Sequence, residues 1–315
     1  SQVRIDKYLF ERLVNSSRNR IQKAADAGFV MANGKPVKSS YKVKPCDVLT
    51  VMMDRPRYDN DIIPEDIPLD IVYEDEDLMV INKPAGLVVH PGCGNYHGTL
   101  VNAIAWHLKD NPKYDPNDPQ VGLVHRIDKD TSGLLVVAKT PDAKTHLGLQ
   151  FYNKTTKRKY NALVWGIVEN DEGTVEGNIG RNPKDRMQMA VLSDPTQGKH
   201  AVTHYRVLER LGYVTLVECV LETGRTHQIR VHMLHLGHPL IGDPIYAKPA
   251  RQKAKPGRLM LHAWRLGFDH PRTGKRMDFE APVPPEYTPW LQLFPNGLYG
   301  AIPEPRPVQE DGGRN

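Results

Sequence analysis

A short polar segment between two apolar runs carries residue types that suit acid–base or nucleophilic chemistry. Within the stretch 123–139, Arg126 and Asp128 lie between an apolar run that ends at Val124 and a second one at 134–138. Short runs rich in branched aliphatic residues favour β-strands, and the Asp, Thr, Ser and Gly residues between them favour a turn. We therefore expect Asp128 to lie at a strand end, held between two buried strands and open to a groove.

Strand alternation predicts on which side of the chain the neighbours of Asp128 lie. If the chain is extended there, alternation places Arg126 and Asp128 on one side and His125 on the other. We therefore expect His125 to be a structural histidine and not a second catalytic group.

This segment also resembles a known family. Its sequence HRIDKDTSGLL is similar to the signature of the RluA-type pseudouridine synthases, which isomerise uridine in RNA. Further segments resemble the same family in its order, and together they cover roughly residues 68–295: NKPAGLVVHP (82–91), KYNALVWG (159–166), ETGRTHQIRVH (222–232), GDPIY (242–246) and LHAWRL (261–266).

The resemblance implies a catalytic set of three residues. Asp128 matches the family's catalytic aspartate, and three routes stay open for it: attack on uracil carbon 6, attack on the anomeric carbon, or deprotonation of the ribose beside that carbon. Tyr160 matches the active-site tyrosine, which can stack on uracil or act as a base near carbon 5. Arg230 matches the cation that pairs with the aspartate, and a nearby cation keeps a carboxylate ionised by lowering its pKa.

Other residues are implied as RNA contacts. By resemblance, Arg126 fills the space that an extruded uridine leaves, because a planar guanidinium can stack where the base had been. Arg225 and Gln228 are weaker candidates for phosphate or base contacts. If 226–236 is helical, Arg230 shares a face with Thr226 and Met233 and can point into the groove.

The sequence predicts no cofactor and no metal. The isomerisation moves the ribose from a ring nitrogen to carbon 5 without net oxidation, and no dinucleotide or P-loop motif is present. Histidines at 227, 232, 235 and 238 are close in sequence, but they form no HExxH motif and the next carboxylate is Asp243.

The positive charge is concentrated at one end of the chain. The net charge is +5, whereas residues 1–50 alone hold ten Lys/Arg and four Asp/Glu, which gives +6. Helices at 4–14 and from Ser17 to Gly28, followed by a hairpin at Asn33-Gly34, resemble an S-four-like RNA-binding domain. Its candidate phosphate contacts are Arg18, Arg20, Lys23, Lys35 and Lys38.

The rest of the pattern indicates an α+β fold. Residues 71–83 read as two strands joined by a turn, and 142–157 as a helix that buries Leu147, Leu149 and Phe151. Further strands are expected at 159–168, 201–208, 213–222, 259–268 and near 275–280. Consecutive strands with short turns predict a mainly antiparallel mixed sheet with flanking helices.

We divide the chain accordingly. The RNA-binding domain spans 1–53, a Pro- and Asp-rich linker 54–69, the catalytic domain 70–297 and a tail 298–315. No apolar run approaches a membrane span, no signal peptide is evident, and the three cysteines lack disulfide or metal spacing. We expect a cytoplasmic protein, with a monomer favoured.

Within the family, the chain looks most similar to the D-type synthases of the large ribosomal subunit, which implies uridines of 23S rRNA. Related enzymes with the same motifs modify other rRNA sites or tRNA, so these targets stay open. Two other classes also stay open: a non-catalytic RNA-binding factor for ribosome assembly, and a metal-dependent RNA hydrolase, although the carboxylate cluster of such hydrolases is missing.

Overall fold

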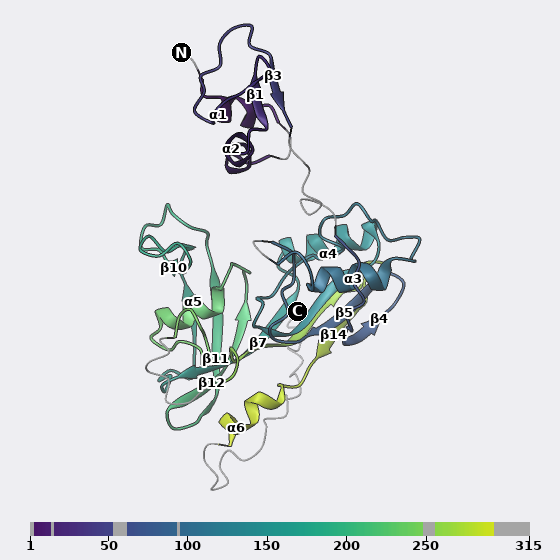
Figure 1. Ribbon diagram of the computed structural model, residues 1–315. Helices are drawn as coiled ribbons and strands as arrows, with labels where there is room; N and C mark the ends of the chain where they lie inside the picture. The colour runs from purple at the N-terminus through teal and green to yellow at the C-terminus, as the bar shows by residue number, and fades with distance from the viewer. Residues whose placement is uncertain (1–2, 14–15, 53–61, 93–94, 248–255, 293–315) are drawn as a thin grey trace. The chain divides into compact units, whose positions relative to one another are not determined.

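The computed structural model describes residues 3–13, 16–52, 62–92, 95–247 and 256–292. Contacts divide the chain into two compact units, residues 1–61 and 62–315 (Figure 1). Residues 54–61 of the expected linker and the expected tail 298–315 lie outside the described residues. In the described part of the chain, no helix is long and apolar enough to cross a membrane.

The first unit packs two helices on a small antiparallel sheet with strand order β2-β1-β3. Asn33 and Gly34 have φ of 51° and 75°, as a two-residue hairpin turn requires, so the predicted hairpin is confirmed. Five buried side chains form its core: Ile5, Leu9, Ile21, Ala25 and Val30. Its elements are α1 (Ile5–Phe10), α2 (Arg18–Asp26), β1 (Val30–Ala32), β2 (Lys35–Pro36) and β3 (Leu49–Val51).

A buried carboxylate ties the two helices of this unit together. Asp6 is inaccessible to solvent and accepts hydrogen bonds from Arg4 at 3.1 Å, Arg18 at 3.2 Å and Gln22 at 2.7 Å. Burial opposes its ionisation, but these donors outweigh it and lower the pKa of Asp6 to about 2. Arg18 is therefore engaged within the protein.

The second unit is built on one large sheet with strand order β4-β5-β6-β13-β7-β12-β11-β8, and β14 also pairs with β13. Among the strand pairs of the described residues, β6–β13 alone is parallel, so the predicted α+β fold with a mainly antiparallel mixed sheet is confirmed. Its strands are β4 (Ile71–Glu74), β5 (Leu78–Lys83), β6 (Ser132–Ala138), β7 (Lys157–Trp165), β8 (Glu172–Glu176), β11 (Val202–Arg210), β12 (Val214–Leu221), β13 (Leu261–Asp269) and β14 (Arg276–Glu280). A separate hairpin pairs β9 (Ile179–Arg181) with β10 (Met189–Val191).

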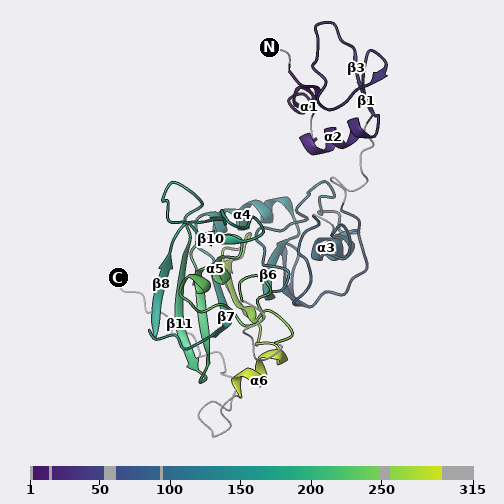
Figure 2. The same cartoon turned by 60° about the vertical axis from the view of Figure 1, so that its left-hand side comes forward.

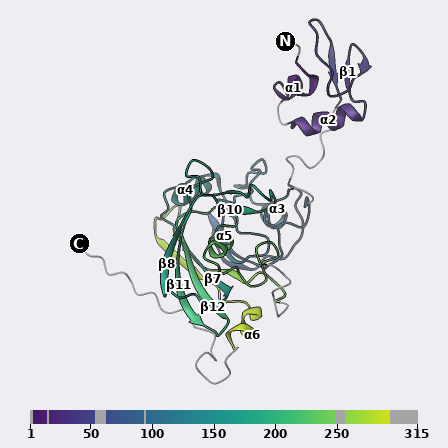
Figure 3. The same cartoon turned by 90° about the vertical axis from the view of Figure 1, so that its left-hand side faces the viewer.

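Helices cover both faces of this sheet because its strands alternate. Odd positions such as Met79 and Leu135 join one core cluster with α3 (Leu100–Leu108) and α5 (Gln228–His235). Even positions such as Val80 and Val136 join another with α4 (Pro141–Tyr152). Figures 2 and 3 show α5 near β10 and in front of strands β7 and β11. A third cluster packs η2 (Pro285–Tyr287) and α6 (Thr288–Leu291) against β7 and β12.

Helix α4 corrects one expectation about the core. Leu147 is fully buried, as predicted, and Phe151 is half-buried one turn further along. Leu149 is instead 54% exposed, because two residues along a helix correspond to a rotation of about 200° toward the opposite face.

The expected strand before Asp128 is not formed. Residues 121–128, which include the expected strand up to Val124, lie outside any strand, and within them an isolated bridge joins Leu123 to Val137 of β6. Val121 and Gly122 have φ of 53° and 79°, and this turn interrupts the extended chain. Asp128 therefore lies in the loop that precedes β6, and the expected alternation of Arg126 and His125 on a strand does not apply.

Gly133→Ala should destabilise the second unit by on the order of 2–4 kcal/mol. Gly133 has φ of +118°, and an added Cβ would overlap the backbone of Ala263, where β6 meets β13. Gly148→Ala is the control, because its Cβ would meet nothing within 4 Å and alanine favours a helix by about 0.5–1 kcal/mol. Urea unfolding followed by tryptophan fluorescence measures this, since all four tryptophans lie beyond residue 61. Equal midpoints for the two variants would contradict the prediction.

Candidate active site

One buried arginine joins two carboxylates from distant parts of the chain. Arg230 donates from Nε and Nη2 to the two oxygens of Asp243, each at 2.8 Å, and from Nη1 to Asp128 Oδ2 at 3.3 Å. The side chains of Arg230 and Asp243 are 4% and 0% exposed, whereas that of Asp128 is 23% exposed. The structure thus brings Asp128 and Arg230 together, and it leaves Asp128 as the accessible member of the group.

Helix α5 aims Arg230 into the protein, and Gln228 fixes where this helix begins. The Gln228 amide donates to Val202 O at 3.0 Å and to Thr203 Oγ1 at 2.9 Å, and its oxygen accepts from Thr223 at 2.7 Å. With all its polar groups bonded internally and 3% exposure, Gln228 acts as a structural anchor. It also lines the pocket, so its expected RNA contact stays a prediction.

Asp243 is a site residue that the sequence analysis did not predict. Its Oδ1 also accepts from the backbone N–H groups of Ile245 at 3.0 Å and Tyr246 at 3.1 Å. Burial opposes the charge of Arg230, but Asp243, and then Asp128, raise the pKa of Arg230 above its ordinary value. The sequence did contain a signal for Asp243, because it is the acidic residue of the family-like segment GDPIY.

Asp128 and Tyr160 line the same pocket, together with Arg126, Arg158 and Arg225. Tyr160 projects from β7 and is 6% exposed, and burial raises the pKa of its phenol above the ordinary value. At neutral pH the pocket therefore presents a protonated phenol and an aromatic ring beside an accessible carboxylate.

The arginines give the pocket a cationic rim. Arg126 is exposed, and Arg225 is held by a 2.8 Å hydrogen bond from Nε to His200 O. Arg158, which the sequence analysis missed, lies 5.4 Å from the Phe151 ring centre, and its buried Nε has no hydrogen-bond partner in the described structure. The sequence signal for Arg158 was its position two residues before Tyr160, because residues two apart on a strand lie on the same face. Such a rim suits RNA phosphates.

His125 takes no part in this rim. Its Nε2 accepts a hydrogen bond from Val136 N at 3.0 Å, and its ring stacks on Phe151 at 4.4 Å. Burial lowers the pKa of His125 to about 3, so the ring is neutral near pH 7. These contacts agree with the expected structural role.

A buried lysine anchors the loop that carries Asp128. Lys83 is fully buried and donates to the carbonyl oxygens of Pro84 at 2.7 Å, Leu87 at 2.9 Å and Lys129 at 2.8 Å. Burial lowers its pKa to about 7, whereas three carbonyl acceptors favour the ammonium form. The family-like segment at 82–91 thereby fixes the residue next to Asp128.

In the first unit, four of the five predicted phosphate contacts are exposed. Lys23, Lys35 and Lys38 point to solvent from α2, β2 and the following loop. Arg18 pairs with Asp6, and Arg20 is half-buried. The three lysines and Arg18 are thus accessible, and of these Arg18 is already held by its ion pair with Asp6.

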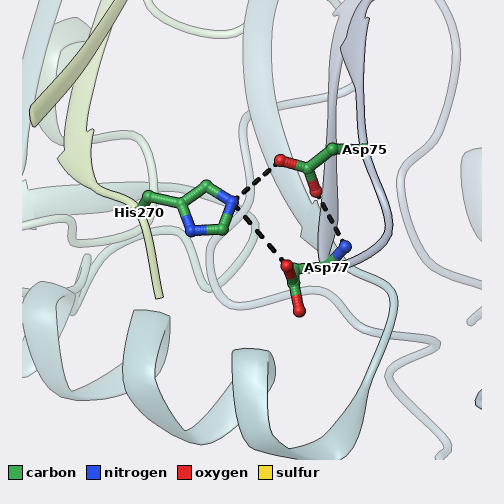
Figure 4. Close-up of side chains that lie close together, drawn as sticks. All are labelled: Asp75, Asp77 and His270. Atoms are coloured by element: carbon green, nitrogen blue, oxygen red, sulfur yellow. Dashed lines mark hydrogen bonds and ion pairs between the residues drawn. The ribbon is translucent and has the colours of Figure 1, made fainter. Parts of the chain in front are cut away.

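One group of His and carboxylate side chains in the described residues has ligand-like spacing, namely Asp75, Asp77 and His270 (Figure 4). His270 Nδ1 accepts from the backbone N–H groups of Arg272 at 3.1 Å and Thr273 at 3.2 Å. Its Nε2 therefore carries the hydrogen and donates to Asp75 at 2.8 Å. A protonated nitrogen offers no lone pair to a metal, so this cluster is better suited to joining the β4–β5 and β13–β14 turns.

Comparisons with known proteins agree with this geometry. A family model described as RNA pseudouridylate synthase matches residues 77–235, and an S4 domain model matches residues 3–49. The chain is 50% identical over 295 residues to an uncharacterized RNA pseudouridine synthase, YlyB, of Bacillus subtilis (strain 168), which covers 93% of this chain and 95% of the relative. Both expected resemblances are thus confirmed.

Two further comparisons concern a named relative and a solved structure. The chain is 42% identical over 309 residues to the ribosomal large subunit pseudouridine synthase D of Nitrosomonas europaea, which covers 96% of this chain and 88% of the relative. The solved structure of human RNA pseudouridylate synthase domain containing 1 is 29% identical, with a TM-score of 0.56 over 68% of this chain and 83% of that chain.

The two carboxylates on Arg230 should respond differently to neutralisation. Asp243→Asn should lower the free energy of unfolding by about 3–5 kcal/mol, because it leaves a buried guanidinium without its main counter-charge. Asp128→Asn should cost about 1 kcal/mol or less, because it removes one longer bond from a partly exposed side chain. Urea unfolding of both variants, followed by tryptophan fluorescence, makes the comparison. A larger loss for Asp128→Asn would show that Asp128 carries the structural role instead.

Proposed function

Because this chain belongs to the RNA pseudouridylate synthase family, we propose that it converts specific uridines of large-subunit ribosomal RNA to pseudouridine, with Asp128 as its catalytic carboxylate. The observation that supports this assignment most directly is the accessible Asp128, paired with an arginine that Asp243 already neutralises. A binding protein has no need for such a group, whereas a nucleophile or base requires an ionised and reachable carboxylate.

The residues of the pocket supply what the isomerisation needs. The bond from the ribose to ring nitrogen 1 breaks, a bond from the ribose to carbon 5 forms, and the proton on carbon 5 moves away as the ring nitrogen gains one. Asp128 starts this sequence by one of the three routes named above, and Arg230 holds its Oδ2 with a hydrogen bond of 3.3 Å. Tyr160 lies where its ring can contact the uracil, and its phenol can receive the carbon 5 proton only after losing its own.

The proposed substrate is an RNA whose target uridine leaves the base stack. Arg126 is exposed at the pocket and fills the vacated space, while Arg158 and Arg225 hold phosphates. Lys23, Lys35 and Lys38 of the first unit add a second contact to the same RNA. We assign the large-subunit rRNA because relatives that match nearly the whole chain carry that name.

The assembly and its location follow from the same proposal. Asp128, Tyr160, Arg230 and Asp243 all come from one chain, so a monomer is sufficient for catalysis. A ribosomal RNA substrate would place the protein in the cytoplasm, where ribosomes are assembled. The division into an RNA-binding domain at 1–53 and a catalytic domain at 70–297 is part of the proposal, although residues 62–69 also contact the second unit through Ile62 and Leu69.

Asp128→Asn should abolish turnover while RNA binding survives, because asparagine keeps the shape but cannot act as a nucleophile or base. The measurement is tritium release from 23S rRNA labelled at uridine carbon 5, with RNA binding measured in parallel. Assembled large subunits and tRNA serve as alternative substrates. Release by the variant at the wild-type rate would remove Asp128 from the mechanism, and binding without release by the wild type on every substrate would favour a non-catalytic factor.

Replacing Lys23, Lys35 and Lys38 together by Gln should weaken RNA binding and flatten its salt dependence. Each lost phosphate contact reduces the slope of log K against log salt by about 0.7–0.9, so the slope should fall by up to about 3. The control replaces Lys109 and Lys113, which pair with Asp110 and Glu76, and should leave the slope nearly unchanged. Equal slopes for wild type and the triple variant would contradict the role of the first unit.

A further inference from the structure

His227 lines the same pocket as Asp128, and the structure holds it in an unusual conformation. It immediately precedes α5 and has φ of 55°, a left-handed conformation that residues with a Cβ adopt rarely and at a cost of order 1 kcal/mol. Its side chain is half-buried and faces the pocket beside Arg230 and Tyr160. The mechanism described above does not use this ring.

A relay of hydrogen bonds fixes which nitrogen of His227 carries its hydrogen. The backbone N–H of Met189, on β10, donates to the Tyr246 hydroxyl at 2.9 Å, and this hydroxyl lies 2.7 Å from His227 Nδ1. Tyr246 is 6% exposed. The Tyr246 oxygen already accepts from Met189, so the Tyr246 hydroxyl donates its hydrogen to His227 Nδ1. If Nδ1 were the donor instead, the buried hydroxyl hydrogen of Tyr246 would have no acceptor.

The relay leaves Nε2 as a hydrogen-bond donor. In a neutral imidazole one nitrogen accepts and the other donates, so acceptance at Nδ1 places the hydrogen on Nε2. Burial lowers the pKa of His227 below its ordinary value, which favours the neutral ring at pH 7. Among the described residues, Nε2 makes no hydrogen bond, and it is therefore available to a molecule in the pocket.

The same turn supports both His227 and the ion pair. Asp243 holds Arg230, and it also accepts from the backbone N–H of Tyr246. The ring of Tyr246 lies 5.2 Å from the Arg230 guanidinium and meets His227 edge to face at 5.5 Å. The position of Nε2 is thus coupled to the groups that hold Asp128, as expected for a group that contacts the substrate of that carboxylate.

We propose that His227 Nε2 donates a hydrogen bond to a carbonyl oxygen of the uracil at Asp128, and that Tyr246 is the positioning residue that sets this donor. The inference rests on the proposed function. A neutral donor suits a neutral carbonyl, whereas the arginines of the rim suit phosphates. If the carbonyl is at carbon 4, the donor also rejects cytidine, because the amino group of cytosine would face another N–H.

The first test compares His227→Leu with His227→Gln on two kinds of RNA. Both variants keep a side chain with a Cβ at the strained position, but only glutamine retains an N–H near the place of Nε2. We expect His227→Leu to lower kcat/KM on 23S rRNA transcripts by about tenfold to hundredfold, and His227→Gln to recover part of the loss. Equal activity of all three proteins would overturn the proposal.

Thio-substituted transcripts separate a substrate contact from a structural role. Transcripts made with 2-thiouridine or 4-thiouridine replace one carbonyl oxygen by sulfur, a weaker acceptor, and nucleoside chromatography after digestion measures the product. Wild type should lose activity on the RNA whose contacted oxygen is replaced, and His227→Leu should show a smaller loss on the same RNA. If sulfur at either position slows wild type and His227→Leu by the same factor, His227 does not contact a uracil carbonyl.

Tyr246→Phe tests the relay in the full-length protein. Nitrogen-15 NMR of the histidine ring should show the Nε2–H form in wild type and a mixture of forms in the variant, with kcat reduced more than RNA affinity. The Nδ1–H form in wild type would overturn the assignment. Absence of pseudouridine formation by the wild type would instead be a failure of the proposed function, and the NMR result would still report on the relay.

Discussion

The site depends on a buried guanidinium that must have a negative partner inside the protein. Removing a charge from water costs several kcal/mol, and a buried charge left without its counter-ion destabilises a protein by about 3–5 kcal/mol. Asp243 meets this need with two bonds of 2.8 Å and no exposure to solvent. Because Arg230 is already compensated, Asp128 can interact with it at a longer distance and stay partly exposed.

This arrangement gives two different tasks to two carboxylates: Asp243 neutralises Arg230, and Asp128 stays accessible to a substrate. A carboxylate that alone neutralised Arg230 would be fixed by the strongest available bonds and would be poorly placed to reach a substrate. Here the structural carboxylate comes from the turn after α5, and the accessible one comes from the loop before β6. Lys83 holds that loop through the carbonyl of Lys129, so the position of Asp128 is set by backbone contacts that do not consume its oxygens.

The sheet brings these segments together because both of its faces are covered. Helices α3 and α5 pack on one face and α4 on the other, so β5 and β6 are buried nearly throughout. The parallel contact of β6 with β13 at Gly133 and Ala263 places the loop of Asp128 next to β7, which carries Tyr160. A rigid central sheet allows Asp128, Tyr160 and Arg230, which come from three separate segments, to keep a fixed geometry relative to one another.

The sequence by itself determined the features that depend on neighbours along the chain. These include the hairpin at Asn33-Gly34, most strands of the large sheet, the basic character of the first fifty residues and the segments that identify the family. It misplaced a strand before Asp128, because the left-handed turn at Val121 and Gly122 is not visible in an apolar pattern. It also predicted Leu149 as buried together with Leu147, although two residues along a helix lie on nearly opposite faces.

Only the tertiary structure decided which residues meet at the site. Asp128 and Arg230 are 102 positions apart in sequence, and no local preference predicts that Asp243 takes two of the hydrogen bonds of this arginine. The same holds for Gln228, whose polar groups are used inside the protein, and for Tyr246, which meets His227 and Met189. Such contacts arise when strands and helices distant in the chain pack together, so their partners are fixed by the fold and not by the pattern of any one segment.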